Sequence, residues 1–271
     1  MDLTDTHCHL NLENFDSDRA EVLLRARQAG ITRILVPGTG VETSRSAVQL
    51  ALSHSMLFAA VGIHPSEANS FDASSLPALR DLARDRRVRA VGEIGLDYYW
   101  NDSPHPLQQE VLKVQLDLAA ELCLPVVIHC REKGDAPDGP CAADLLVILE
   151  AWVKSLERDA NPLANHPGVL HSFSGSLATA HQAMELNFLL GVTGPVTHRK
   201  ERQERITTLP LESLLIETDA PFMAPVPMRG KRNEPAFVRH IADKIALLQS
   251  HTLEQVAAVT SQNAARLFSW E

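Results

Sequence analysis

Short, mainly apolar runs alternate with longer segments of helical periodicity along most of the chain. Segment 106–122 shows the helical pattern clearly, because Leu107, Val111, Val114 and Leu118 recur close to the 3.6-residue repeat that places side chains on one helix face. The run 57–63 is instead short and apolar, as is typical of a buried strand. The two patterns succeed one another from about residue 17 to the end of the chain.

These patterns predict eight strands and nine helices. The predicted strands cover residues 3–8, 31–36, 57–63, 88–91, 125–128, 168–170, 188–192 and 214–216. The predicted helices cover residues 17–30, 41–53, 74–84, 106–122, a segment ending near 157, 176–186, 200–208 and two segments after residue 234. Thr252 and Gln255 form a capping-box pattern, which marks the start of the last helix.

Eight strand–helix repeats predict an α/β fold with parallel strands covered by helices. We expect a closed (β/α)8 barrel, the TIM barrel, that forms one domain over residues 1–271 with an extra C-terminal helix. A doubly wound open sheet is the alternative. It is disfavoured because no glycine-rich phosphate fingerprint follows the first strand.

Metal-binding residue types fall where the predicted strands end. His7 and His9 are two residues apart, so a strand would place both imidazoles on one face. An isolated His-x-His pair is more often solvated or packed, but four more residues of this kind follow later strands. The candidate ligands are His7, His9, Glu93, His129, His171 and Asp219. In a barrel these strand ends open on one face, and six ligands suit two divalent cations that share a carboxylate.

Charge and composition narrow the classes of function. The formal net charge of −9 argues against a long non-specific DNA groove, although bound cations and a few arginines could hold nucleic acid locally. Residues 1–5 lack an export signal, and no apolar run approaches a membrane span, so we expect a cytoplasmic protein without a membrane partner. The cysteines form no C-x-x-C pair and are expected to be reduced; they are Cys8, Cys123, Cys130 and Cys141.

Short motifs surround the candidate ligands and continue to the end of the chain. They are Asp5-Thr6-His7-Cys8-His9, Gly62-Ile63-His64-Pro65, Gly92-Glu93-Ile94-Gly95-Leu96-Asp97, Ile128-His129-Cys130-Arg131, His171-Ser172-Phe173-Ser174-Gly175, Glu217-Thr218-Asp219-Ala220-Pro221, residues 229–235 and residues 263–268. Together these motifs resemble the TatD family of metal-dependent deoxyribonucleases, in order from about residue 2 to 268. The resemblance implies a barrel of the metallo-dependent hydrolase (amidohydrolase-like) type that hydrolyses phosphodiesters. One departure is the long segment 132–167, which carries extra residues around the fifth helix and bears on substrate range.

The resemblance also implies a division of the ligands. Glu93 would bridge two metal ions, His7, His9 and Asp219 would complete one site, and His129 and His171 the other. Two cations that share a water would supply a hydroxide near neutral pH, and Asp219 could also accept a proton. Histidine-rich ligation suits zinc or manganese, and the family pattern also allows magnesium.

Four further polar residues are candidates for catalysis or substrate binding. His64 could hold a phosphate or donate a proton, or only pack. Glu217 shares the face of Asp219, so it could support a ligand or make a plain contact inside the barrel. Asp97 could orient a ligand or the substrate, and Arg131 could bind phosphate in a bidentate manner, whereas many arginines only form surface ion pairs.

Two loops on the same face could bind a strand. Arg229, Lys231 and Arg232 follow the eighth strand and could hold phosphates, or form a solvated charged segment. The aromatic cluster 98–100 follows the fourth strand and could stack on bases, or only cap the rim of the barrel.

We therefore expect a monomeric, cytoplasmic two-metal deoxyribonuclease that acts on DNA ends or oligonucleotides. The same site could instead hydrolyse an ester, lactone or amide, because the nucleophile would be unchanged. A third possibility is a metal-binding barrel without catalysis, although the filled ligand positions argue against it.

Overall fold

The computed structural model describes residues 2–100 and 102–270, and eight parallel strands form its centre. Each strand pairs with the next one in chain order, which is the order of a (β/α)8 barrel and not of a doubly wound sheet. The strands are β1 Leu3–Asp5, β2 Ile31–Pro37, β3 Leu57–Val61, β4 Val88–Asp97, β5 Val126–Arg131, β6 Gly168–Leu170, β7 Leu189–Val192 and β8 Leu214–Ile216.

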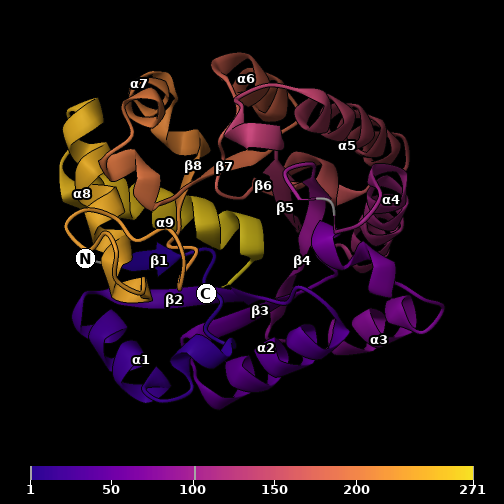
Figure 1. Ribbon diagram of the computed structural model, residues 1–271, viewed down its shortest axis with the longest axis horizontal. Helices are drawn as coiled ribbons and strands as arrows, with labels where there is room; N and C mark the ends of the chain where they lie inside the picture. The colour runs from indigo at the N-terminus through magenta and orange to yellow at the C-terminus, as the bar shows by residue number, and fades with distance from the viewer. Residues whose placement is uncertain (1, 101, 271) are drawn as a thin grey trace.

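Helices surround the strands, and Figure 1 shows α1 to α8 as a ring with α9 inside it. The α-helices are α1 Arg19–Gln28, α2 Val41–Ser53, α3 Ser75–Leu82, α4 His105–Leu122, α5 Pro140–Arg158, α6 Leu177–Glu185, α7 Lys200–Thr208, α8 Val238–Gln249 and α9 Leu253–Phe268. Short 3₁₀ helices lie between them: η1 Glu13–Phe15, η2 Pro65–Ser70, η3 Lys133–Asp135, η4 Pro162–Asn165, η5 Gly194–Thr197, η6 Leu211–Ser213 and η7 Pro235–Phe237. In the part of the chain that is described, no helix is long and apolar enough to cross a membrane.

The barrel closes between β1 and the segment after β8. The backbone N–H of Thr6 donates to the carbonyl of Ile216 (3.2 Å), and that of Asp219 donates to the carbonyl of His7 (2.8 Å). The backbone N–H of His9 donates to the carbonyl of Ala220 (2.8 Å). These bonds bring the residues after the first strand against those after the last, although they are more than 200 positions apart in the sequence.

Two apolar layers result from the alternation of side chains along the strands. Val127 belongs to a small cluster inside the barrel, whereas its neighbours Val126 and Ile128 pack outward in the large cluster beneath the helices. From the strands, the inner cluster takes Leu35, Phe58, Ala60, Ala90, Val127, Val169 and Leu215. It is completed by Leu267 and Phe268 of α9 and by Trp270, whose ring centroid lies 5.0 Å from that of Phe58.

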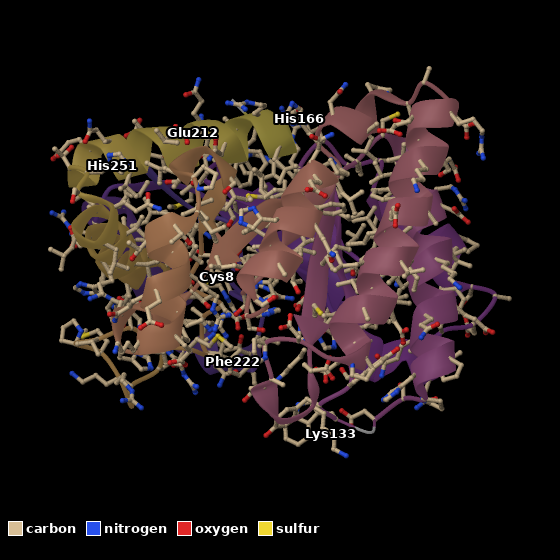
Figure 2. All side chains as sticks on the ribbon, turned by 90° about the horizontal axis from the view of Figure 1, so that it is seen from above. Cys8, Lys133, His166, Glu212, Phe222 and His251 are labelled. Atoms are coloured by element: carbon tan, nitrogen blue, oxygen red, sulfur yellow. The ribbon has the colours of Figure 1, made fainter. Side chains whose placement is uncertain are left out.

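The two ends of the barrel differ in what lies on them. In Figure 2, Lys133 and Phe222, which follow β5 and β8, lie at one end. His166 and Glu212, which precede β6 and β8, lie at the other end. Since Phe58 is near the start of β3, its contact with Trp270 places the C-terminal residues at this second end, and the first end is left open for a site.

Three strand ends differ from the sequence prediction by three residues or more. β1 ends at Asp5 and not at residue 8, because the next residues turn to bond with the segment after β8. β4 continues to Asp97 and β5 to Arg131, so that Gly95 pairs with His129 inside both strands. Gly95 allows this pairing, since a Cβ there would lie 2.0 Å from the carbonyl oxygen of His129.

Candidate metal centre

A cavity of about 630 Å³ opens at the carboxyl ends of the strands. Its wall carries His9, His64, Glu93, Asp97, His129, Arg131, His171 and Asp219. His7 lies directly beneath, fully buried, with its Nε2 3.2 Å from Glu93 Oε2. The structure thus brings all six predicted ligands together at one end of the barrel.

His7 and His9 meet Asp219 where the barrel closes. The two histidine Nε2 atoms lie 3.2 Å apart, and His9 Nε2 lies 3.4 Å from Asp219 Oδ1. Asp219 adopts a left-handed backbone conformation with φ of 54°, which aspartate tolerates better than most residues. The neighbouring Thr218 is fixed by Asp5, which accepts hydrogen bonds from its backbone N–H (2.8 Å) and its hydroxyl (2.6 Å).

Glu93 lies at the centre of the cluster, and its two carboxylate oxygens face different histidines. Oε2 lies 3.2 Å from His7 Nε2 and 3.6 Å from His9 Nε2. Oε1 lies 2.8 Å from His129 Nδ1, 3.7 Å from His64 Nε2 and 3.8 Å from His171 Nε2. This carboxylate is therefore shared between two groups of imidazoles.

Two further carboxylates hold the histidines of this cluster from behind. Glu217 is completely buried, lies 2.9 Å from His171 Nδ1 and accepts a hydrogen bond from the backbone N–H of Ser172 (2.5 Å). Gly191 makes room for it, because a Cβ there would lie 2.2 Å from Glu217 Oε1. Asp97 Oδ2 lies 2.9 Å from His129 Nε2. Both contacts fix the orientation of an imidazole, as carboxylates behind metal-binding histidines do.

Burial and the shared charges set the protonation of the cluster. Burial lowers the pKa of His129, but its hydrogen bonds to Asp97 and Glu93 and their charges outweigh burial and raise that pKa to about 10. For His171, the charges of Glu217 and Glu93 likewise outweigh burial and raise the pKa to about 9. Burial and the charge of His129 lower the pKa of His64 to about 3, so this imidazole is neutral.

The carboxylates show the opposite balance. Burial raises the pKa of Glu93, but the charges of His7 and His171 and the hydrogen bond of His129 outweigh burial and hold this pKa well below its usual range. For Asp219, the hydrogen bond of His9 and the charge of His171 outweigh burial and lower the pKa. Both carboxylates are therefore ionised and able to bind a cation.

The donor set fits divalent cations. Donor atoms on one tetrahedral zinc ion lie ~3.3 Å apart, since each bond is about 2.0–2.1 Å long. The distances from His7 and His9 to each other, to Glu93 and to Asp219 fall around this value, from 3.2 to 3.9 Å. Three groups of donors lie within 4.8 Å: His7, Glu93 and His171; His7, His9 and Asp219; and His64, Glu93 and His129.

The distances between the imidazole rings add one detail to the predicted division of the ligands. His129 lies beside His64, with ring centroids 4.4 Å apart, whereas the His171 ring is 6.4 Å away. His171 instead stacks on His7 with ring centroids 3.5 Å apart. His64, which the sequence suggested for substrate, is thus a neighbour of the predicted ligands.

The predicted substrate residues divide between the cavity and other surfaces. Arg131 lines the cavity, pairs with Asp135 (2.9 Å) and lies over the Tyr99 ring, 3.8 Å from its centroid. Trp100 also lines the cavity and is 51% exposed. Tyr98 is buried and donates its hydroxyl to Asp144 (2.8 Å), so it is not available for stacking on a base.

The basic loop after β8 is also divided. Arg229 is exposed and lines a second pocket beside the cavity, and Lys231 is exposed. Arg232 lines neither pocket, because its guanidinium pairs with Asp18 (2.7 Å) and lies over the Phe15 ring. This placement does not support a phosphate contact for Arg232.

Sequence reasoning missed three residues at or near the site. Asp5 stands in the same motif as His7 and was passed over, although a buried acid there had the motif as its signal. Phe222 is 53% exposed at the mouth of the cavity, and only its position after β8 pointed to it. Arg202 lines the cavity from α7, and nothing in the periodicity of that helix distinguished it.

Comparisons with known proteins show which family the chain resembles. A family profile described as TatD related DNase matches residues 4–269. The uncharacterized metal-dependent hydrolase YabD of Bacillus subtilis (strain 168) is 39% identical over 268 residues, which cover 98% of each chain. The protein named 3′-5′ ssDNA/RNA exonuclease TatD of Erwinia amylovora is 36% identical over 272 residues, with 97% of this chain and 98% of the relative covered. The crystal structure of YJJV, a TatD homologue from Escherichia coli k12, superimposes with a TM-score of 0.88 at 33% identity, and covers 99% of this chain and 98% of its own.

Proposed function

The chain belongs to the TatD-related DNase family of metal-dependent hydrolases, and we propose that it removes nucleotides from the 3′ end of single-stranded DNA. The observation that carries the proposal is the Glu93 carboxylate, whose two oxygens face separate groups of imidazoles in an open cavity. The name of the Erwinia relative supports the polarity and the single strand, and adds RNA as a candidate substrate.

The proposal includes two divalent cations, zinc, manganese or magnesium, that share Glu93. His7, His9 and Asp219 would hold one on the Oε2 side, and His129 and His171 the other on the Oε1 side. Cations held there would neutralise phosphate charge and lower the pKa of a water molecule.

The residues around the cluster would move protons and hold the phosphate. Asp219, ionised and at the cavity wall, would orient the attacking water and accept its proton. His64 Nδ1 accepts a hydrogen bond from the backbone N–H of Ser66 (3.2 Å), so its neutral imidazole carries the proton on Nε2. That Nε2–H lies on the cavity side, with Nε2 3.7 Å from Glu93 Oε1, and would donate a hydrogen bond to a phosphate oxygen or to the leaving group.

The mouth of the cavity would hold the bases without reading their sequence. Trp100 and Phe222 both lie on the cavity wall and are about half exposed, at 51% and 53%. Base stacking on such rings is tolerant of sequence, because every base has an aromatic face. We also propose that the protein acts as a cytoplasmic monomer and that residues 1–271 form one catalytic domain.

The proposal is tested on chelated protein reloaded separately with zinc, manganese or magnesium. We expect turnover only after reloading, loss of label from the 3′ end of single-stranded DNA or RNA, and little hydrolysis of an ester or a lactone. Full activity without metal, or faster turnover of the lactone than of any strand, would contradict the nuclease function.

Metal content is measured on the same samples. Glu93→Ala should lower occupancy from about two ions per chain to fewer than one, whereas His129→Ala should mainly empty one site. His54→Ala is the matched control, because His54 is exposed and follows α2 at the opposite end of the barrel. Two ions and near-normal turnover in Glu93→Ala would contradict the shared carboxylate.

A further inference from the structure

We propose that a cationic pocket beside the metal cavity binds a second phosphate of the strand, next to the phosphodiester that is cleaved. This inference rests on the proposed nuclease function and adds a specific substrate contact to it. The site lies between α7, the loop after β6 and the loop after β8. None of its α7 residues was suggested by the sequence motifs.

The pocket has a volume of about 490 Å³ and lies beside the metal cavity. The two spaces share five lining residues, which are Arg131, Asp135, Ser174, Arg202 and Met223. A strand whose terminal phosphodiester lies at the metal cluster can therefore extend into this pocket without leaving the protein surface.

The pocket wall carries far more positive than negative charge. Five arginines line it, with only two carboxylates, Asp135 and Glu201. Each of these carboxylates has an arginine partner, since Asp135 lies 2.9 Å from Arg131 and Glu201 lies 3.6 Å from Arg199. Among the described residues, no carboxylate oxygen lies within 4.0 Å of the guanidinium of the other three, which are Arg202, Arg205 and Arg229.

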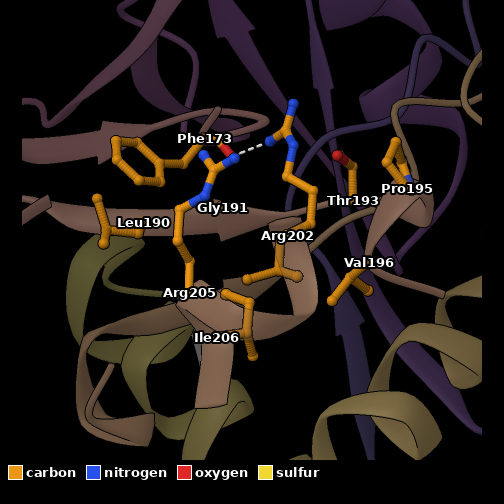
Figure 3. A pocket seen from close by; sticks show the side chains of 10 residues that line it. Phe173, Leu190, Gly191, Thr193, Pro195, Val196, Arg202, Arg205 and Ile206 are labelled. Carbon is orange, nitrogen blue, oxygen red and sulfur yellow. Dashed lines mark hydrogen bonds between the residues drawn. The ribbon is translucent and has the colours of Figure 1, made fainter. Parts of the chain in front are cut away.

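Arg202 and Arg205 are held in place by the backbone. Figure 3, a view of a smaller neighbouring pocket that Arg202 and Arg205 also line, shows both side chains extending toward Phe173. Arg202 donates to the carbonyl of Phe173, and Arg205 donates to the carbonyls of Ser174 and Gly175. A guanidinium has five N–H donors, so these bonds fix the fork and leave other donors for an anion.

The crowding of these cations is costly when no anion is bound. Burial and the charges of Arg205 and Arg199 lower the pKa of Arg202 to about 10. Burial and the charges of Arg229 and Arg199 also lower the pKa of His198, which lines the same pocket. A positive region of this size stands out in a chain with a net charge of −9. A phosphodiester fits it because it is a compact anion that arginine binds in a bidentate manner.

The test compares two short oligothymidylates that differ in one linkage. One strand has phosphate throughout, and the other has a neutral methylphosphonate at the linkage next to the terminal one. Affinity and kcat/KM are measured on the metal-loaded protein, on Arg202→Gln and Arg229→Gln, and on Arg27→Gln. Arg27 is exposed in the last turn of α1 at the opposite end of the barrel, so it gives a matched loss of charge.

We expect Arg202→Gln and Arg229→Gln each to bind the all-phosphate strand ~10-fold more weakly than the wild type does. The wild type should bind the methylphosphonate strand more weakly than the all-phosphate strand by a similar factor. On the methylphosphonate strand, the affinity of each variant should be less than ~3-fold below that of the wild type. Arg27→Gln should match the wild type on both strands. Arg229 is exposed, so its variant keeps the test valid if Arg202→Gln fails to fold.

Equal losses by the variants on both strands would overturn the pocket assignment, as would a wild type that does not distinguish the strands. The cleavage measurement tests the nuclease function, and the affinity measurement tests the phosphate site, so the two proposals can fail independently. A wild type that binds both strands but cleaves neither would contradict the nuclease function, while the comparison of affinities would still decide the phosphate site. A wild type that binds neither strand overturns the phosphate site.

Discussion

Arg232 shows how a basic residue near a site can serve the fold instead of the substrate. Its guanidinium forms two parallel hydrogen bonds to Asp18, Nη1 to Oδ1 at 2.8 Å and Nη2 to Oδ2 at 2.7 Å. It also donates to the carbonyl of Asn14 (2.6 Å). These contacts attach the loop after β8 to the segment that precedes α1.

Arg232→Ala should therefore lower stability more than strand binding. We expect a loss of about 0.5–1 kcal/mol in the free energy of unfolding at pH 7, which is typical of a partly exposed ion pair with good geometry. The hydrogen bond and charge of Arg232, together with Arg25, lower the pKa of Asp18 below its usual 3.8. A carboxyl group whose pKa is lower in the folded than in the unfolded protein stabilises the fold at pH values above its unfolded pKa. This stabilisation is lost as the pH falls through the pKa of the folded state.

The difference in the free energy of unfolding between the wild type and Arg232→Ala should accordingly be fully present at pH 5–7 and become smaller below pH 3.8. Urea unfolding at several pH values measures it, with the exposed Lys231→Ala as the control. Unchanged stability together with a large loss of strand affinity would show that Arg232 reaches the substrate after all.

At the scale of elements, α9 and the residue pair after it complete the inside of the barrel. Leu267, Phe268 and Trp270 join the inner apolar cluster, and the Trp270 ring lies 4.7 Å from Phe268 and 5.0 Å from Phe58. The other helices cover the strands from outside, whereas this segment closes the end opposite the metal centre.

Trp270→Ala should destabilise the fold while leaving the metal centre intact. Trp270 is 1% exposed, and removing a buried tryptophan costs about 3–5 kcal/mol in the free energy of unfolding. Leu247→Ala on α8 is the control, since Leu247 is 74% exposed and its loss should cost less than about 0.5 kcal/mol. Urea unfolding and metal content should be measured together. A folded variant that loses metal but keeps its stability would contradict the separation of the two ends.

Periodicity predicted the elements of this fold well where local signals are strong. α2 and α7 have the predicted bounds, and the capping box of Thr252 and Gln255 begins α9 as expected. β4 was predicted too short because glycines weaken a strand pattern. Its extension depends on pairing with β5, which a local pattern does not contain.

The candidate ligands could be predicted for a related reason. All six follow or end apolar runs, and a barrel brings the carboxyl ends of its strands to one face. The strand pattern could not show which basic residues line the cavity and which form ion pairs elsewhere. Arg232 pairs with Asp18, a residue 214 positions away, and Arg202 lines the cavity from a helix whose sequence is polar except for Ile206.

At the scale of the whole molecule, the barrel separates stability from chemistry. The apolar segment around Trp270 lies at one end, and the buried ionisable groups lie at the other. Two carboxylates and the histidines around them are costly to bury without mutual pairing. Because Glu217 and Asp97 hold His171 and His129 from behind, that pairing also fixes the ligand positions before a cation arrives.

The same pairing makes metal binding depend on pH. Without metal, the pKa values of about 10 for His129 and about 9 for His171 keep both imidazoles protonated at pH 7. A ligating histidine must lose a proton, so metal affinity should rise with pH, and ~2 protons should be released near pH 7. Calorimetric titration of chelated protein with zinc, in buffers of different ionisation enthalpy, counts these protons directly.

Glu217→Gln gives this measurement an internal comparison. The charge of Glu217 is the main influence that opposes burial at His171, so without it the pKa of that imidazole should fall from about 9, although the charges of Glu93 and Asp219 still raise it. We expect the variant to release fewer protons than the wild type, by at most about one, because a larger share of His171 would then be neutral before zinc binds. The slope of log affinity against pH should fall by the same amount. Zinc binding without proton release in the wild type would mean that His129 and His171 are neutral beforehand or do not bind the metal.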